Sequence, residues 1–133
     1  MRVAFDTNAW VSFAIGKRLT ALAALLKRTD VEVLRCPQLE AELLDVVNRP
    51  KMARFINSER RELVIRLLLQ STQSCLLVPP FARFSRDPKD DYLLALAQQA
   101  RLDYLVTGDK DLLVLGTHLQ TEILTFTDFT SRL

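Results

Sequence analysis

Acidic side chains stand at the ends of apolar runs in this sequence, where several carboxylates could act together. Asp6 follows the first apolar run directly, Asp109 follows another through a Thr-Gly pair with Asp111 two residues later, and Asp90 and Asp91 open a further apolar stretch. Converging carboxylates that lack matching basic neighbours repel one another and lose hydration, at a cost of several kcal/mol each, unless a divalent ion neutralises them. The single histidine argues against a His-based hydrolase, and the two cysteines lack zinc-site spacing. Oxygen ligands alone suit a hard cation, Mg²⁺ or Mn²⁺.

Each of these acids could instead be a turn or helix-cap residue, because Asp caps helices often. The choice matters most for Asp90 and Asp91, which fall in the first turn of a predicted helix, at the favourable end of its dipole. At about 100° per residue, Asp90 projects nearer the line of Leu93 and Ala97 than Asp91 does. We therefore expect Asp90 to face inward.

A predicted helix at residues 38–47 offers a glutamate to the same site. Its apolar residues at positions 39, 43, 46 and 47 have the spacing of an amphipathic helix. Glu42 lies roughly 60° to one side of Leu39, on the margin of the apolar stripe, whereas Asp45 points well away. Glu40 lies on the opposite margin, so periodicity alone leaves the choice between the two glutamates open.

An alternation of strands and helices must position these acids. Strands are predicted at residues 2–5, 31–34, 75–78, 104–107 and 122–126, and helices at 19–28, 38–47, from 58 through an apolar stripe ending at 68, at 90–100 and, as a short turn, at 128–132. Pro79-Pro80 ends the third strand and Asp87-Pro88 marks a turn. This order predicts an α/β fold with a mainly parallel sheet, in which ligands bind at the carboxyl ends of the strands. Asp6 and Asp109 fall at two such ends.

The composition bounds the class of protein. With 133 residues, 49% of them hydrophobic, the chain can bury one core, so we expect a single domain over residues 1–133. The 18 Lys and Arg against 16 Asp and Glu leave a net charge of +2, so any nucleic-acid contact must come from a local cluster. The longest apolar runs are far shorter than the roughly 20 residues that span a bilayer, and we see no secretory signal. We expect a cytoplasmic protein with no membrane contact.

Four strings in this order, across nearly the whole chain, resemble one family: "RVAFDTNAWVS", "LEAELLDVVNRPK", "DPKDDYLLALA" and "DYLVTGDKDLL". They are similar to the PIN-domain ribonucleases, and specifically to the VapC-like toxin components of toxin-antitoxin pairs. The resemblance implies a three-layer α/β/α fold with a short, mainly parallel central sheet. It also implies Mg²⁺ or Mn²⁺ as cofactor, RNA as substrate, a homodimer or higher even oligomer, and a cognate antitoxin protein as partner.

The resemblance assigns residues as well. Its acid after the first strand falls on Asp6, its glutamate on Glu42, and its acid seven residues before the closing alanine of an Ala-x-Ala pair on Asp90. The implied catalytic and metal-binding residues are Asp6, Glu42, Asp90 and Asp109, with Asp111 as a further or alternative ligand, and the implied supporting residues are Thr7, Asn8, Asp91 and Thr107. Trp10 and Phe13 stand where the family pattern has smaller aliphatic residues after Asp-Thr-Asn. We expect this difference to affect the shape of the wall of the site and not its ligands.

These residues lead to the hypothesis of metal-assisted hydrolysis of an RNA phosphodiester, with one or two ions held by the acids. RNA contact is predicted for Arg49, Lys51 and Arg54. They belong to the segment 49–66, which contains six basic residues and only two acidic ones, Glu59 and Glu62. Such clusters are about as often merely solvated helix faces, so the basic segment alone does not identify an RNA-binding surface.

Two alternatives belong to other classes. A haloacid-dehalogenase-like phosphatase needs a second acid two residues after its strand-end aspartate to protonate the leaving group, and that position here is Asn8. The other alternative is a catalytically inert PIN-like binding module whose acids only cap helices. Stabilisation by Mg²⁺ or Mn²⁺ distinguishes the metal site from that module.

Overall fold

A computed structural model describes residues 1–16, 18–79, 81 and 90–133 of the chain. Its strands are β1 (Arg2–Phe5), β2 (Glu32–Arg35), β3 (Gln73–Ser74), β4 (Tyr104–Val106), β5 (Thr117–His118) and β6 (Thr121–Leu124). Within the described residues these six strands form one sheet in the order β3-β2-β1-β4-β6-β5. All neighbours run parallel except β5 and β6, which are antiparallel.

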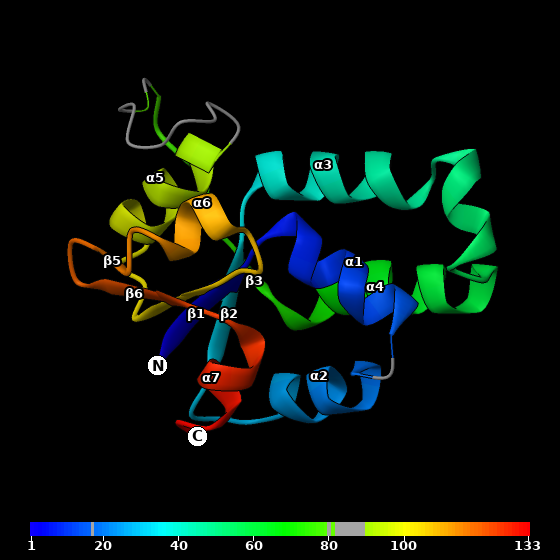
Figure 1. Ribbon diagram of the computed structural model, residues 1–133, viewed down its shortest axis with the longest axis horizontal. Helices are drawn as coiled ribbons and strands as arrows, with labels where there is room; N and C mark the ends of the chain where they lie inside the picture. Colours follow the sequence, from blue (N-terminus) through cyan, green and yellow to red (C-terminus); the bar gives the residue numbers. More distant parts are fainter. Residues whose placement is uncertain (17, 80, 82–89) are drawn as a thin grey trace.

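Helices cover both faces of this sheet, so the fold is a three-layer α/β/α sandwich (Figure 1). The helices are α1 (Thr7–Ile15), α2 (Leu19–Leu26), α3 (Pro37–Val47), the 3₁₀ helix η1 (Pro50–Arg54), α4 (Ser58–Ser71), α5 (Asp91–Gln99), α6 (Lys110–Leu113) and α7 (Phe126–Thr130). In Figure 1, α1 to α4 lie together on one side of the strands and α5 on the other. The predicted α/β fold class, with its short and mainly parallel central sheet, is confirmed.

The central strand β1 sets the position of the first acid. β1 lies between β2 and β4, and its residues Val3, Ala4 and Phe5 are fully buried. Phe5 is in register with Val106, the last residue of β4, so the segments that follow the two strands leave from the same edge of the sheet. The backbone N–H of Asp6 donates to the carbonyl of Val106 at 3.0 Å. The sheet therefore places the end of β1 directly beside the end of β4.

The helix α1 was absent from the predicted elements. It begins directly after Asp6, whose backbone is extended and whose Oδ1 accepts the N–H of Ala9 at 2.7 Å, the arrangement of an N-cap. Its side chains Trp10 and Phe13 are 0% exposed and contact Phe5 edge-to-face, with ring centroids 5.8 and 5.6 Å apart. The two departures from the family pattern are therefore core residues and do not form the wall of the site.

The predicted strand at residues 75–78 is wrong in position, because β3 consists of residues 73–74. β2 ends at Arg35 since Pro37 begins α3, so the last ladder bond joins the Cys75 N–H to the Arg35 carbonyl at 2.8 Å. Beyond it, the side-chain amide of Gln99 takes the place of a partner strand. It accepts the N–H of Val78 at 2.9 Å and donates to the carbonyl of Val78 at 3.1 Å.

The other predicted elements lie within a few residues of the observed ones, and α5 is buried from residue 91 to residue 97, as its apolar sequence predicted. The short elements η1, α6 and β5 were not predicted. The predicted turn at Asp87-Pro88 lies outside the described residues. No helix in the described part of the chain is both long enough and apolar enough to cross a membrane.

Candidate active site

Asp6 is a buried carboxylate held from two sides. It is 3% exposed and follows the last residue of β1. Its Oδ1 accepts the Ala9 N–H from α1, and its Oδ2 accepts the hydroxyl of Thr107, which follows β4. Two segments that are 101 residues apart in sequence therefore fix the orientation of one carboxylate.

Burial raises the pKa of Asp6 from its ordinary value of 3.8 to about 6. The hydrogen bonds from Thr107 and Ala9 oppose this rise, and the negative charges of Asp109 and Glu42 add to it. These last two contributions mean that the carboxylates of Asp109 and Glu42 each lie near enough to that of Asp6 to repel it. A cation among them would relieve that repulsion.

Asp109 is tied to the same hydroxyl as Asp6. Its backbone N–H donates to Oγ1 of Thr107 at 2.9 Å, so the threonine hydroxyl accepts from one acid and donates to the other. Oδ1 of Asp109 accepts the N–H of Asp111 at 2.9 Å and caps α6. Asp109 is half-buried whereas Asp111 is exposed, so Asp109 is the more enclosed of these two predicted ligands.

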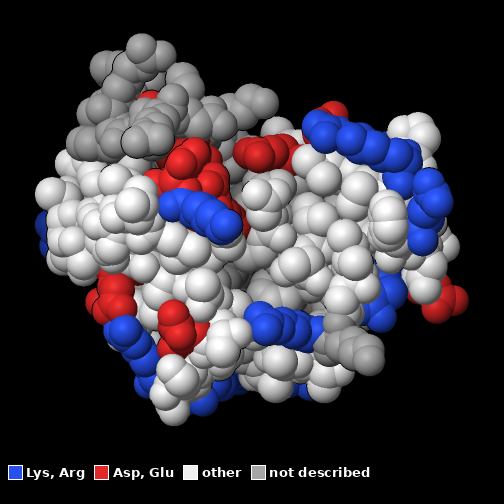
Figure 2. All heavy atoms as spheres, viewed as in Figure 1, with Lys and Arg blue, Asp and Glu red and all other residues white. Residues whose placement is uncertain are grey.

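Glu42 reaches a cleft of about 470 Å³ between α1, α3 and α5. The hydroxyl of Tyr92 on α5 donates to Oε2 of Glu42 at 2.6 Å, and the same hydroxyl lies 3.4 Å from that of Thr7. Figure 2 shows acidic side chains gathered where α5 and α6 approach the start of α3. The cleft is lined by Asn8, Glu42, Asp45, Val46, Arg49 and Tyr92.

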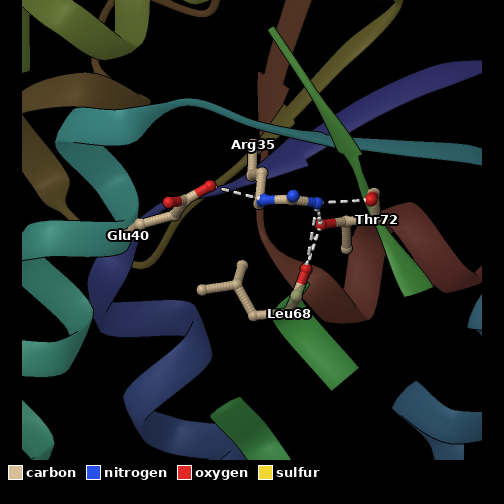
Figure 3. Close-up of polar contacts among 4 residues, drawn as sticks. All are labelled: Arg35, Glu40, Leu68 and Thr72. Carbon is tan, nitrogen blue, oxygen red and sulfur yellow. Dashed lines mark hydrogen bonds and ion pairs between the residues drawn. The ribbon is translucent and has the colours of Figure 1, made fainter. Parts of the chain in front are cut away.

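Glu40, the other glutamate that periodicity left open, has a different partner. Its Oε1 accepts from Nε of Arg35 at 2.5 Å (Figure 3). The same guanidinium donates to the hydroxyl of Thr72 at 3.0 Å, to the Thr72 carbonyl and to the Leu68 carbonyl. Arg35 thereby joins β2 to α3 and to the end of α4. The structure thus brings Glu42 to the cleft and leaves Glu40 in an ion pair away from it.

The burial of the two acids at the start of α5 differs from the burial that the helical projection predicted. Asp91 is 5% exposed and is the more buried of the two, whereas Asp90 is half-buried with its Oδ2 enclosed. Asp90 is the N-cap residue of α5, and Asp91 is the first residue of the helix. The expectation that Asp90 faces inward more than Asp91 is wrong, because Asp91 is the more buried residue. The role of Asp90 as a metal ligand stays a prediction.

A family model for the PIN domain matches residues 2–111 of the chain, a span that includes every acid described above. The chain belongs to the PIN-domain family. PIN domains are generally nucleases, hydrolases that act on nucleic acids and typically use divalent metal ions. No curated protein matches the sequence significantly.

The oxygen donors of this PIN domain fit a divalent cation by their chemistry. Within the part of the chain that the structure describes, no three acids are arranged to hold an ion directly. A buried carboxylate is nevertheless present, with two further negative charges near enough to raise its pKa. The oxygen donors of Asp6, Asp109 and Glu42 are hard ligands, which suit Mg²⁺ or Mn²⁺.

Among the expected supporting residues of the PIN domain, Thr107 has a side chain that contacts Asp6. The hydroxyl on the buried carboxylate is that of Thr107, while Thr7 contacts Tyr92 and Asn8 is exposed at the cleft. Tyr92 was absent from the predicted site, because in the sequence it reads as one residue of an apolar helix. Its partner Glu42 is 50 residues away, so no local pattern indicates the contact.

The basic residues predicted to contact RNA lie beside the cleft. Arg49, Lys51 and Arg54 are exposed at the end of α3 and in η1, where Figure 2 shows a row of basic side chains. Arg49 lines the cleft and pairs with Asp45, with Nη2 2.7 Å from Oδ2. Such an exposed pair contributes little to stability and can be exchanged for a phosphate. Arg60 instead donates to two backbone carbonyls at the end of α1, which removes it from the basic cluster.

Proposed function

We propose that this PIN domain is a Mg²⁺- or Mn²⁺-dependent endoribonuclease, and that it is the VapC-like toxin of a toxin-antitoxin pair. In this proposal residues 1–133 form one domain that acts in the cytoplasm as a homodimer or higher even oligomer, and a cognate antitoxin protein inhibits it. The observation that carries metal dependence is the buried Asp6, with a pKa that burial and the neighbouring charges of Asp109 and Glu42 raise to about 6. A divalent ion supplies the positive charge that this cluster needs.

Acids from four segments would hold the ion: Asp6, Glu42, Asp90 and Asp109, with Asp111 as a further ligand. When bound, Mg²⁺ or Mn²⁺ lowers the pKa of the attacking water and offsets the negative charge that develops on the phosphate. Thr107 and the Ala9 N–H fix the Asp6 carboxylate, so this ligand does not need to be oriented when the ion arrives. Tyr92 contacts Glu42 from the other side of the cleft.

The RNA backbone binds across Arg49, Lys51 and Arg54 in this proposal. Arg49 shares the cleft with Glu42, so a phosphate that it binds lies next to the acids. Because phosphate contacts release counterions, Arg49→Gln should weaken RNA binding and reduce its dependence on salt. Arg66→Gln, on an exposed part of α4, is the matched control that should leave both unchanged.

The decisive experiment is cleavage of total RNA by the purified protein with Mn²⁺, with Mg²⁺ and with EDTA. We expect metal-dependent cleavage by the wild type and at least a hundredfold loss in Asp6→Asn and Glu42→Gln, on the order of the effect of removing a main electrostatic element. Glu40→Gln is the matched control. It carries the same substitution on the same helix, but its carboxylate pairs with Arg35, so cleavage should be retained.

Each outcome bears on a different part of the proposal. Cleavage that survives EDTA or the Asp90→Asn substitution would indicate a contaminating nuclease or a wrong residue. If Mn²⁺ neither raises the unfolding temperature of the wild type nor supports cleavage, the chain is an inert PIN-like module. If the wild type and Asp6→Asn are stabilised by Mn²⁺ equally, the ion binds elsewhere.

The toxin role has its own test. Induced expression of the wild type in a bacterial host should arrest growth, and expression of Asp6→Asn should not. Normal growth with active wild-type protein present would reject the toxin role and leave the nuclease assignment standing.

A further inference from the structure

Tyr92 joins three helices at the cleft through one hydroxyl group. The residue belongs to the first turn of α5 and is 9% exposed. Its hydroxyl donates to Oε2 of Glu42 on α3 at 2.6 Å and lies 3.4 Å from the hydroxyl of Thr7 on α1. The short distance to Glu42 is that of a hydroxyl bonded to a charged acceptor. Tyr92 also forms part of the lining of the 470 Å³ cleft, so this contact is made inside the candidate site.

The carboxylate of Glu42 needs such a restraint. Its side chain is long, and fixing it in one rotamer costs conformational entropy. The buried carboxylate of Asp6 lies near enough for the charge of Glu42 to act on it, so the two acids repel each other when both are ionised. A glutamate on the margin of a helix face would therefore turn toward water unless a donor held it. Tyr92 supplies that donor from a rigid ring with only two rotatable bonds before it.

The contact leaves part of the carboxylate available. The Tyr92 hydroxyl bonds Oε2 and not Oε1 of Glu42, and Glu42 is one of the residues that line the cleft. A carboxylate oxygen also has two acceptor positions, so even Oε2 is not saturated by one hydroxyl. The bond thus orients Glu42 without occupying the whole group.

We propose that Tyr92 is a positioning residue: its hydroxyl holds the Glu42 carboxylate in the cleft so that its remaining oxygen can bind the divalent ion. This inference rests on the proposed function, because it assumes that the ion binds beside Glu42. Tyr92 acts on the ion only through Glu42 and touches neither the ion nor the RNA.

A double-mutant cycle measured by Mn²⁺ binding tests this role without using activity. The dissociation constant for Mn²⁺ is measured by electron paramagnetic resonance of the unbound ion for wild type, Tyr92→Phe, Glu42→Gln and the double variant. Loss of a hydrogen bond to a charged group should weaken binding about tenfold in Tyr92→Phe. In the Glu42→Gln background the same change should have no further effect, since the group that Tyr92 orients no longer carries the charge.

The chain offers a matched control in its second tyrosine. Tyr104 lies on β4 and packs against Phe129, and Tyr104→Phe removes the same atom without touching the cleft. Its Mn²⁺ affinity should equal that of the wild type. Thermal unfolding in EDTA verifies that each variant is folded. If Tyr92→Phe does not fold, Glu42→Asp breaks the same contact from α3 by shortening the acid, and it should weaken Mn²⁺ binding by at least the same factor.

The outcomes separate this inference from the proposed function. A wild type that does not bind Mn²⁺ overturns the proposed metal site and the role of Tyr92 with it. If the wild type binds Mn²⁺ and Tyr92→Phe binds it equally well, only the positioning role is overturned. Equal weakening by Tyr92→Phe in both backgrounds also overturns it, because the tyrosine then acts through packing and not through Glu42.

Discussion

The substitution Asp6→Asn should stabilise the metal-free protein at neutral pH, although it removes a residue of the candidate active site. Asparagine has nearly the same shape as aspartate. Its carbonyl can accept the Ala9 N–H, and its amide group can donate to the hydroxyl of Thr107, so both contacts of the buried side chain persist. What the substitution removes is a negative charge at a site that is 3% exposed.

The size of the effect follows from the pKa of Asp6. Because burial raises that pKa from 3.8 in the unfolded chain to about 6, the native state binds more protons than the unfolded state between these values. The contribution of Asp6 to the stability of the native state is therefore fully present below pH 3.8 and is lost as the pH rises through about 6. At about 1.4 kcal/mol per pH unit, the ionised carboxylate costs the native state about 3 kcal/mol above pH 6. Neutral contacts are weaker than charged ones, so the net gain in Asp6→Asn is about 1–3 kcal/mol.

Urea unfolding in EDTA at pH 4 and at pH 7.5 measures the difference. Trp10 is the only tryptophan and is 0% exposed, so its fluorescence reports unfolding of the core. Asp6→Asn should exceed the wild type in stability at pH 7.5, and the advantage should largely vanish at pH 4. Asp128→Asn, at an exposed position of α7, is the matched control and should change stability by less than about 1 kcal/mol at both pH values.

Two results would refute this reasoning. One is an Asp6→Asn protein that is less stable than the wild type at pH 7.5 without metal, and the other is a difference that does not change with pH. Saturating Mn²⁺ gives a further test, since at a hundred times its dissociation constant a ligand of the native state adds about 2.7 kcal/mol. The wild type should gain this stability and Asp6→Asn should not.

Substitutions at three further positions test the surroundings of the site. Thr107→Val removes the hydroxyl that lowers the pKa of Asp6, so the loss of stability with rising pH should extend above pH 6 in urea unfolding experiments. Arg35→Ala should destabilise the protein by about 3 kcal/mol because Glu40 and two carbonyls lose a largely buried partner, and Arg35→Lys should restore only part of this since lysine lacks the guanidinium geometry. Trp10→Ala should cost about 3–5 kcal/mol, measured by thermal unfolding, by opening a cavity in the core.

The sequence predicted the parts of the site that depend on strand ends. Alternating strands and helices imply a parallel sheet, and such a sheet brings Asp6 and the segment around Asp109 to one edge, as observed. The same local patterns did not reveal α1, because "AWVSFAI" is apolar almost throughout and hides the helical period. The position of Asp6 as a possible N-cap was the available signal for that helix.

Non-local contacts account for the other differences. The length of β3 depends on where β2 ends, which Pro37 decides from a distant part of the chain. The choice between Glu40 and Glu42 depends on Arg35 and Tyr92, which lie on other elements. The spacing of residues within one helix does not encode partners on other elements. Periodicity could therefore narrow the candidate ligand to Glu40 or Glu42, but it could not decide between them.

Helix capping and ion binding, posed as alternatives for Asp6, are compatible in this fold. The Ala9 N–H on Oδ1 and the Thr107 hydroxyl on Oδ2 leave acceptor positions on both oxygens. The same two bonds lower the pKa of Asp6 against the effect of burial, so they keep the carboxylate charged near neutral pH. A buried acid without them would be protonated over more of that range and would bind a cation more weakly. The contacts that begin α1 therefore also maintain the charge that a metal ligand requires.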